Sequence, residues 1–261
     1  MERPKRTAYP LTFANNLQPI FINSSHYSAD YYRVRYRNYI RWGILSLETV
    51  KMDHKHLHTA EDGITRCWWG NDHLDYRNYH DEEWGRPVSN DFQLFEKICL
   101  EGFQSGLSWL TILRKRENFR QAFAGFNFSK IAGFDDNNVA SLLQNSGIIR
   151  HRGKIEATIN NASRAIELVD EFGSLAAYIW QWQPASPETH IGKGEYKHPI
   201  PSITKTSQLL SKDLKNRGWK FFGPTTAYAF MQAMGLVNDH LEGCASRKIV
   251  ETLRSEFEPP N

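Results

Sequence analysis

Two cysteines and two histidines place the strongest constraint on how this chain folds. Cys67 and His80 lie thirteen residues apart, and His240 and Cys244 lie four apart, which puts both side chains on one side of a helical turn. Thiolate and imidazole are ligands that tetrahedral zinc prefers. A site formed by all four would join segments 160 residues apart, and a crosslink over so long a loop stabilises a fold by about 4–5 kcal/mol in the chain-entropy model. By spacing alone, a zinc site and two ordinary buried cysteines beside two unrelated histidines fit equally well.

Length and composition indicate the class of protein. The 261 residues suffice for one large domain or two small ones. A formal net charge of +3 is compatible with a polyanionic partner. No apolar run reaches the roughly 18 residues that span a bilayer, and the N-terminus lacks the apolar core of a signal peptide. Three cysteines provide no disulfide framework, and Cys99 lies in an apolar run typical of a core thiol. We therefore expect a cytoplasmic protein with no membrane association.

The first 62 residues differ from the rest. Residues 31–41 alternate aromatics with arginines and show no apolar face, and residues 52–58 are rich in histidine. One interpretation is a basic arm for nucleic acid. The other, which we favour, is a disordered leader or a stretch upstream of a true start at Met52. The predicted organisation is an N-terminal extension at 1–62, disordered or a mis-assigned start, a folded domain at 63–252 and a C-terminal tail at 253–261.

Helical periodicity dominates from residue 90 onward. Apolar positions recur every three or four residues, and Asp, Ser or Thr precede several of these segments while glycines follow them. The predicted helices cover residues 91–99, 109–119, 136–143, 154–172, 175–182, 207–214 and 226–234. Residues 183–203 contain four prolines and two glycines and are predicted to form a loop. Without a strong period-2 run, we expect an all-α fold.

Two turns are candidates for contact with a phosphate backbone. Residues 214–226 read as a helix, a turn between Gly218 and Gly223 and a new helix start, where backbone N–H groups beside Lys220 suit a phosphate oxygen. Residues 147–154 form a second turn, which carries three cations. Taken singly, the two glycines of the first turn also fit an ordinary helix connection, and a turn like the second is more often a solvated charged turn. Together they favour nucleic acid as the partner.

Five segments resemble the 3-methyladenine DNA glycosylase I (Tag) family. They are residues 66–70, 79–85, 100–109, 147–155 and 235–244. The resemblance implies a helix-hairpin-helix DNA glycosylase fold, with a zinc site joining the N- and C-terminal segments through Cys67, His80, His240 and Cys244. A site with four protein ligands has no open position, so this zinc would be structural.

The resemblance also implies a function. The chain would be a monofunctional base-excision repair glycosylase, acting as a nucleoid-associated monomer that flips 3-methyladenine out of alkylated double-stranded DNA and releases it by hydrolysis. The base pocket would be lined by the aromatic residues Trp69, Tyr76, Tyr79 and Trp109. The residues implied to contact DNA are Gly106, Leu107, Arg150, Arg152, Lys154, Gly218, Lys220 and Gly223. Among them, Gly106 and Leu107 match the family's wedge, which fills the gap that the flipped base leaves in the duplex. Before the resemblance, each aromatic is more simply an ordinary core residue, and a plain core leucine remains an alternative for Leu107.

Glu101 matches the family's base-reading carboxylate and is the predicted catalytic residue. It follows an apolar run and precedes Gly102, a setting in which a carboxylate is partnered, strongly shifted in pKa or functional, unless it lies on the helix surface. The alkylated base carries a positive charge, which an ionised carboxylate among aromatic rings favours. A cationic purine is also a good leaving group, so a narrow substrate range is expected.

Several positions depart from the family or its relatives. Phe103 replaces a usual glutamine and Trp219 a usual phenylalanine, which puts fine details of DNA contact in doubt. Thr225 stands where bifunctional relatives carry a lysine nucleophile, so no lyase activity is expected. Asn238, followed by Asp239, stands where related glycosylases have an aspartate that assists departure of the sugar.

Two competing functions fit part of the sequence. A non-catalytic reader of damaged DNA would keep the pocket and bind a lesion without releasing the base. A zinc-dependent hydrolase would use Glu101 or Glu242 as its base and would need an open coordination position.

Overall fold

The computed structural model describes residues 56–70, 73–191 and 198–260. By its internal contacts the chain divides into Met1–Val50 and Lys51–Asn261, and all described residues belong to the second unit. The interpretations of residues 31–41 and of a start at Met52 lie outside the described residues. Within the described part the fold is mostly helical, which confirms the prediction from periodicity.

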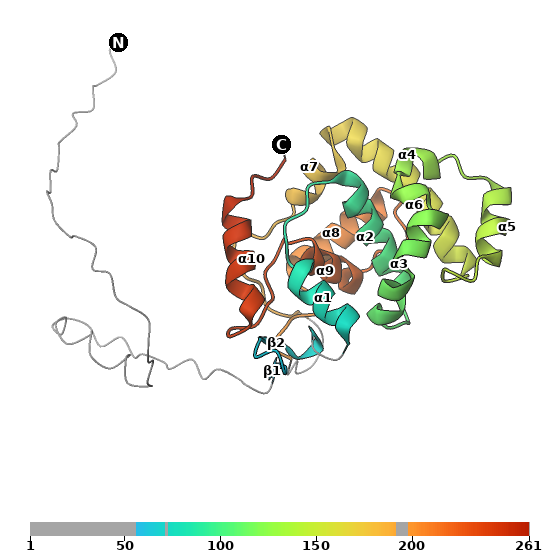
Figure 1. The fold of residues 1–261 in the computed structure, drawn as a ribbon. Helices are drawn as coiled ribbons and strands as arrows, with labels where there is room; N and C mark the ends of the chain where they lie inside the picture. The colour runs from blue at the N-terminus through green and yellow to red at the C-terminus, as the bar shows by residue number, and fades with distance from the viewer. Residues whose placement is uncertain (1–55, 71–72, 192–197, 261) are drawn as a thin grey trace, which may run out of the picture. The chain divides into compact units, whose positions relative to one another are not determined.

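The elements follow one another in a simple order (Figure 1). They are β1 (Leu57–Thr59), β2 (Thr65–Cys67), η2 (Trp68–Gly70), α1 (Leu74–Glu82), α2 (Asp91–Gln104), α3 (Trp109–Ala122), η3 (Ala124–Phe126), α4 (Phe128–Ile131), α5 (Asp136–Gln144), α6 (Arg152–Phe172), α7 (Leu175–Trp180), α8 (Lys205–Asn216), α9 (Pro224–Ala233) and α10 (Ala245–Glu256).

Helix α2 lies at the centre of the helical core. It packs against α3, α6, α7 and α9, and its buried stretch runs continuously from Lys97 to Phe103. Asn90 begins the helix, because its side chain accepts a hydrogen bond from the backbone N–H of Gln93. Each fully buried large apolar side chain contributes about 1.5–3 kcal/mol. A lysine and a glutamate buried in such a helix therefore require partners.

Capping explains where the other predicted helices begin and end. Asp135 forms a capping box at α5, and Gly173, at φ 83°, ends α6. Thr204, not the predicted Ser207, is the N-cap of α8. The Ser207 side chain lies at the third helical position and completes the capping box with Thr204.

A β-hairpin near the start of the described chain and the last helix near its end were not predicted. β1 pairs with β2 in an antiparallel hairpin in which Leu57 lies opposite Cys67, and strands of three residues are too short to show period-2 alternation. The folded part therefore begins before residue 63. At the other end, α10 continues past residue 252 to Glu256, and the Phe257 ring lies 4.4 Å from that of Trp180.

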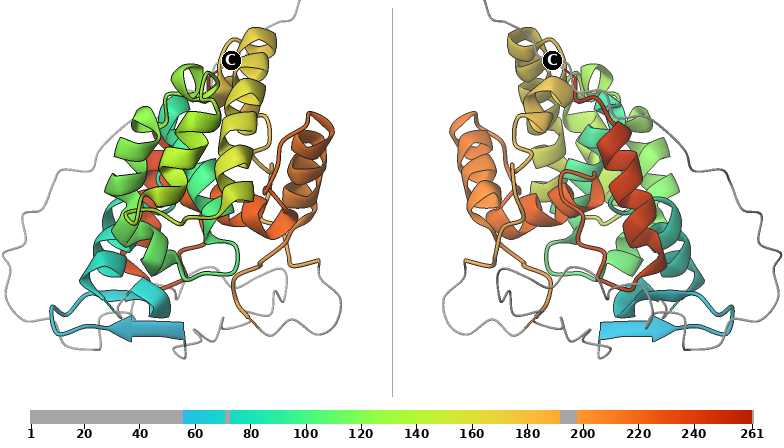
Figure 2. Two further views of the ribbon diagram at one scale, coloured as in Figure 1. Left: turned by 90° about the vertical axis from the view of Figure 1, so that its right-hand side faces the viewer. Right: turned by 90° about the vertical axis from the view of Figure 1, so that its left-hand side faces the viewer.

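Helices α8 and α9 form a packed pair joined by the turn at residues 217–223 (Figure 2). Gly218, at φ 85°, ends α8, and the N–H of Trp219 donates to the carbonyl of Leu214 at 2.9 Å. The side chain of Asn161 holds the turn by accepting from the N–H of Lys220 and donating to its carbonyl, both at 2.9 Å.

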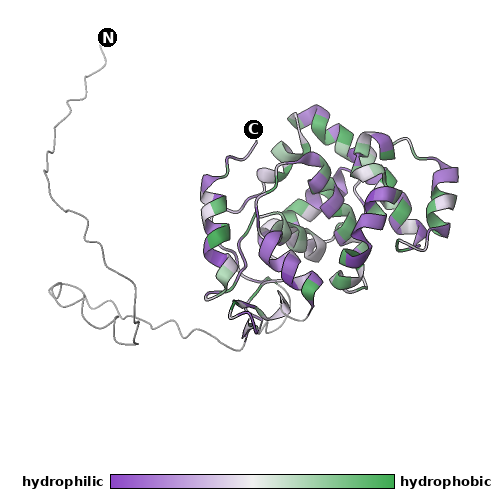
Figure 3. Cartoon of the chain, viewed as in Figure 1, coloured by the Kyte–Doolittle hydropathy of each residue, from purple (hydrophilic) through white to green (hydrophobic). Residues whose placement is uncertain are grey.

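Hydrophobic and hydrophilic residues lie on different sides of several helices, including α6 and α10 (Figure 3). Phe103 and Trp219, the two departures from the family pattern, are buried at 1% and 4% exposure. The Phe103 ring packs 4.6 Å from that of Phe119, so these two changes fill the core. In the described ranges, we find no helix with both the length and the apolar character required to cross a membrane.

Candidate functional site

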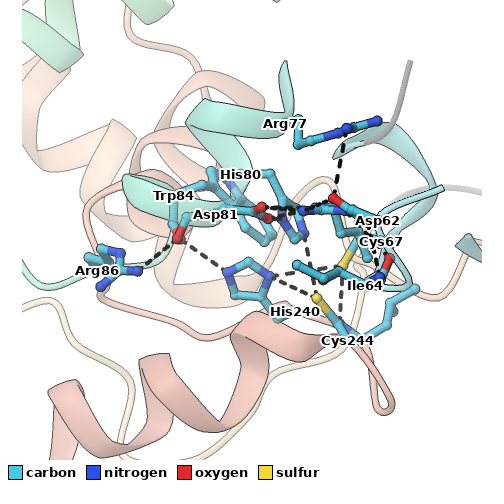
Figure 4. Close-up of polar contacts among 12 residues, drawn as sticks. Asp62, Ile64, Cys67, Arg77, His80, Asp81, Trp84, Arg86, His240 and Cys244 are labelled. Carbon is cyan, nitrogen blue, oxygen red and sulfur yellow. Dashed lines mark hydrogen bonds and ion pairs between the residues drawn. The ribbon is translucent and has the colours of Figure 1, made fainter. Parts of the chain in front are cut away.

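The two cysteines and two histidines come together as a buried Cys–His cluster formed by Cys67, His80, His240 and Cys244 (Figure 4). All four candidate ligand atoms lie within 4.8 Å of one another. Cys67 ends β2, His80 lies in α1 and Cys244 is the N-cap of α10. The prediction that His240 and Cys244 share a helical turn is wrong. They lie in the loop between α9 and α10, where a turn closed by the N–H of Cys244 and the carbonyl of Leu241 brings them together.

Distances within the cluster suit a tetrahedral metal ion. The Cys244 sulfur lies 3.5 Å from His80 Nε2 and 3.5 Å from His240 Nδ1, and the Cys67 sulfur lies 4.0 Å from the same His240 nitrogen. Tetrahedral zinc with its usual bond lengths separates sulfur from nitrogen by roughly 3.5 Å. The donor set and its spacing therefore fit zinc.

Both histidines are oriented by their other ring nitrogen. His80 Nδ1 lies 2.8 Å from an Asp81 carboxylate oxygen, and His240 Nε2 lies 3.1 Å from the carbonyl oxygen of Trp84. Each acceptor places the ring proton on the nitrogen that it contacts. The nitrogen facing the two sulfurs is then free to bind a metal, as in carboxylate-supported zinc sites.

Arg66 supports this arrangement from the outside. Its side chain is nearly fully buried and contacts the Asp81 carboxylate at 2.7–3.0 Å, and it also pairs with Asp62 at 3.0 Å. Burial raises the pKa of Asp81, but the hydrogen bonds from Arg66 and His80 outweigh it and the pKa lies below its usual value. The ionised carboxylate thus keeps His80 in its orientation.

The two thiols differ in their affinity for a proton. The hydrogen bond with Cys67 lowers the pKa of Cys244, aided by His240 and His80, and the same hydrogen bond with burial raises the pKa of Cys67. The two thiols therefore lose one proton readily, and a bound cation favours loss of the second proton.

A cavity of about 480 Å³ lies beside the cluster. The predicted pocket residues Trp69, Tyr76, Tyr79, Trp109 and Glu101 all line it. They come from η2, α1, α2 and α3, so the cavity forms where these four elements meet. Helix α9 forms a further wall of the cavity, which was not predicted from the sequence. The α9 residues that line the cavity are Thr225, Tyr228, Ala229 and Gln232.

The aromatic wall of the pocket touches the Cys–His cluster. The Trp69 ring lies 4.9 Å from that of Trp84 and 5.0 Å from that of His80, both edge-on. Gly70 permits this approach, since a Cβ atom there would lie 2.7 Å from the His80 ring. Tyr79, adjacent to His80 in sequence, lies 5.4 Å from the Trp109 ring. Helix α1 therefore contributes His80 to the cluster from one face and Tyr79 to the pocket from the adjacent face.

Glu101 is buried, and its partner is a lysine that the sequence analysis missed. The Lys97 ammonium lies 2.8 Å from a Glu101 carboxylate oxygen, donates to the Tyr79 hydroxyl at 2.6 Å and lies 3.5 Å from the centre of the Trp109 ring. Burial lowers the pKa of Lys97 and raises the pKa of Tyr79. The spacing of four residues between Lys97 and Glu101 was the available signal.

The turn between α2 and α3 presents the predicted wedge to solvent. Gly106 adopts φ 81°, and Leu107 is 42% exposed, which excludes a core leucine. The arginines of the second basic turn are also exposed: Arg150 lies just before α6, and Arg152 pairs with Glu156 at 3.2 Å. These side chains are accessible to a partner.

Lys154 occupies a different setting from the arginines. Its side chain is buried at 7% exposure, and the ammonium donates to the carbonyls of Phe103 at 2.9 Å and Ser105 at 2.7 Å. It thereby caps the end of α2 and supports the turn that carries Leu107. The exposed Lys220 and Gly223 lie in the turn between α8 and α9, along with Gly218.

After α9, Asn238 contacts the segment that carries His240, and Asp239 contacts side chains that line the pocket. Asn238 donates to the carbonyl of Arg247 at 3.1 Å and accepts from the N–H of His240. Asp239 instead accepts from Tyr228 at 2.7 Å and from Gln232 at 2.8 Å, and both donors line the cavity. Asp239 is therefore the acidic group behind the α9 side of the pocket.

Comparison with known proteins places these features in a family. Residues 68–248 match the family described as methyladenine glycosylase. DNA-3-methyladenine glycosylase 1 of Escherichia coli (strain K12) is 45% identical over 181 residues, covering 69% of this chain and 96% of the relative.

Solved structures give the same result. A crystal structure of 3-methyladenine DNA glycosylase I (TAG) has a TM-score of 0.62 and 47% identity over 69% of this chain and 98% of the other. A variant of 3-methyladenine DNA glycosylase I in complex with 3-methyladenine has a TM-score of 0.63 and 35% identity over 68% and 95%. The chain belongs to the methyladenine glycosylase family.

Proposed function

We propose that the protein is a monofunctional base-excision repair glycosylase that flips 3-methyladenine out of alkylated double-stranded DNA and hydrolyses its N-glycosidic bond. The observation that carries this proposal is the cavity in which Trp69, Tyr76, Tyr79 and Trp109 surround the buried carboxylate of Glu101. Its volume of about 480 Å³ is within the range of small-ligand pockets. A purine turned out of the stack meets aromatic faces and one anionic group there.

Charge explains the preference for an alkylated base. Alkylation at a ring nitrogen leaves a delocalised positive charge on the purine, which attracts both aromatic faces and a carboxylate. The same charge makes the purine a good leaving group. Binding in the flipped geometry therefore supplies much of the required acceleration, and neutral bases leave too slowly.

The groups around the sugar favour hydrolysis without a covalent intermediate. Thr225 lines the cavity where bifunctional relatives carry a lysine, and a threonine hydroxyl is a weaker nucleophile than a lysine amine. We expect borohydride to trap no covalent complex with DNA.

Contact with DNA involves three turns. Helices α8 and α9 with residues 217–223 form the helix-hairpin-helix motif, in which Gly223 as N-cap supplies no side-chain oxygen to the N–H groups that begin α9. A phosphate oxygen suits that position, with the exposed Lys220 nearby. Leu107 fills the gap that the flipped base leaves, and the exposed Arg150 and Arg152 neutralise the backbone.

The Cys–His cluster holds structural zinc in this proposal. Cys67, His80, His240 and Cys244 supply four ligands, so zinc there contributes a crosslink between β2, α1 and the loop before α10. The protein residues of the pocket carry out binding and excision. We expect a monomer that acts on chromosomal DNA in the cytoplasm.

Base-release chromatography tests this function. The wild-type protein, incubated with methylated duplex DNA, should release free 3-methyladenine. Glu101→Gln should lower the rate by about 10–100-fold, because a hydrogen bond to a charged group is worth about 1.5–3 kcal/mol. The control Glu167→Gln, on the exposed face of α6, should match wild type. Tight binding to a lesion duplex without base release would instead support a reader of damaged DNA.

A further inference from the structure

A buried cation that the proposed mechanism does not use lies behind the base pocket. Lys97 is 5% exposed, and its ammonium contacts Glu101 at 2.8 Å and the Tyr79 hydroxyl at 2.6 Å. The ammonium also lies 3.5 Å from the centre of the Trp109 ring. These are three of the five side chains proposed to read the base.

Lys97 reaches these groups from behind the pocket. It lines a second cavity of about 210 Å³ on the far side of Tyr79 and Trp109, which both cavities share as a wall. That second cavity is lined by charged side chains that pair with each other: Arg116 with Glu83 at 2.5–2.8 Å and Arg120 with Glu96 at 2.9 Å. Lys97 is thus left to pair with the carboxylate of the base pocket.

We propose that Lys97 is a positioning residue that neutralises Glu101 and holds the Glu101 carboxylate, the Tyr79 hydroxyl and the Trp109 ring in their reading positions before the base arrives. This inference rests on the proposed function and deepens it. The empty pocket is then electroneutral, and Glu101 recognises the base through directed contacts from an already ionised carboxylate.

Removal of Lys97 has a consequence that depends on pH. A buried carboxylate without its counter-ion takes up a proton in place of remaining charged. At neutral pH such a pocket loses its anion and with it the attraction for a cationic base. At higher pH the carboxylate ionises again, and the attraction returns.

Other charged or titratable groups line the two cavities beside Glu101 and Lys97. They are Tyr76, Tyr79 and Glu82 from α1, Glu83 and Arg86 after α1, Glu96 from α2, Arg116 and Arg120 from α3, Tyr228 from α9 and His198 in the loop before α8. Since all of them remain in Lys97 variants, a change of pH profile that requires both Lys97 and Glu101 belongs to this pair.

Single-turnover excision from a duplex with one 3-methyladenine, measured against pH, tests the proposal. Lys97→Met should lower the rate at neutral pH by at least about tenfold and recover as pH rises. The double variant K97M/E101Q should stay slow at every pH, and Lys130→Met, at an exposed lysine, should match wild type. A loss by the same factor at all pH values would show that Lys97 only fills space. An unchanged rate would equally overturn the proposal.

Thermal melts of wild type, K97M, E101Q and K97M/E101Q test the pair without substrate. Because each single variant leaves one buried charge or hydrogen-bonding group unpaired, the double variant should melt above K97M. This result is expected even if the wild-type protein releases no base, so failure of the proposed function and failure of the Lys97 assignment are distinguishable. Additive losses in melting temperature would overturn the pairing.

Discussion

Single residues link the Cys–His cluster to the proposed base pocket. Trp84 accepts a hydrogen bond from His240 through its carbonyl and lines the pocket with its ring. Trp69 lies against both His80 and the cavity, and Tyr79 precedes His80 in α1. A shift of the histidines by a few tenths of an ångström would therefore move the aromatic walls of the proposed base pocket.

The pKa of Lys97 makes stability depend on pH. Burial lowers this pKa, and the Glu101 charge only partly opposes it, so the folded value lies below the unfolded value of about 10.4. Between these values the unfolded chain binds more protons, and the free energy of unfolding rises with pH. The contribution is present above the unfolded pKa and is lost as pH falls through the folded one.

Urea unfolding of wild type and Lys97→Met at several alkaline pH values checks this expectation. The difference in free energy of unfolding, wild type minus variant, should increase through the window between the two pKa values. Two parallel curves would show that the Lys97 pKa is the same in both states.

The sequence identified most pocket residues but not the contacts among them. The four aromatics and Glu101 were predicted to be together and do line one cavity, although their roles stay predictions. Lys97 was not predicted because a lysine within an apolar stretch of a helix usually indicates an exposed position. Only the meeting of α1, α2 and α3 shows that its ammonium has three partners.

At the scale of elements, α2 connects the core to the proposed base pocket and to the proposed DNA contact at Leu107. Glu101 lies in the last turn of α2, and the loop that follows this helix carries Leu107. Lys154, from the first turn of α6, holds that turn through two carbonyls. The C-terminal end of α2 therefore positions both Glu101 and the turn that carries Leu107.

Leu107→Ala tests the wedge. We expect excision from duplex DNA to fall by about tenfold, since an apolar side chain no longer fills the gap in the stack. Stability should change by less than about 0.5 kcal/mol because the side chain is exposed. Leu209→Ala, at 46% against 42% exposure, is the matched control. Equal rates for both variants in a duplex excision assay would refute the assignment.

Lys154→Met tests the support of this turn. Loss of the ammonium leaves the carbonyls of Phe103 and Ser105 without their donor, which should cost about 1–3 kcal/mol in urea unfolding. Excision from duplex DNA should fall as well, because Leu107 is no longer held in place. Lys212→Met, at an exposed position of α8, should alter neither measurement. A stable variant with normal excision would leave Lys154 without this role.

The helices α5 and α6, which have strong end signals, were predicted well, and α1 and α10 were missed. α5 and α6 have a capping aspartate and a terminal glycine, respectively. α1 begins at His73, which makes no side-chain cap, and only Tyr79 and His80 are buried in it. α10 buries only Ser246 and Val250. Both helices depend on contacts with distant segments, which periodicity cannot reveal.

At the scale of the whole domain, the Cys–His cluster joins the beginning and the end of the described fold. β2 and α1 supply two ligands, and the loop and cap before α10 supply the others. β2 also packs against α10. The polar network of Arg66, Asp81 and Asp62 surrounds this junction.

Removal of metal tests the structural assignment. Purified protein should contain one zinc per chain by mass spectrometry. Chelation should lower the melting temperature, and activity should decline in proportion to the folded fraction. Cys244→Ser should lose zinc, whereas Cys99→Ala, at a buried thiol outside the cluster, should retain it. A chelated protein that stays folded but inactive would instead place the metal in the chemistry.

The positions of the four cysteine and histidine residues also determine what cleavage of the backbone at one site would do to the domain. A break within residues 183–191 would leave Cys67 and His80 on one fragment and His240 and Cys244 on the other. Neither fragment alone contains four ligands or a complete pocket, because α9 would be separated from α1, α2 and α3. Recombination of two such fragments would therefore depend on zinc, and the domain could serve as a metal-controlled split enzyme.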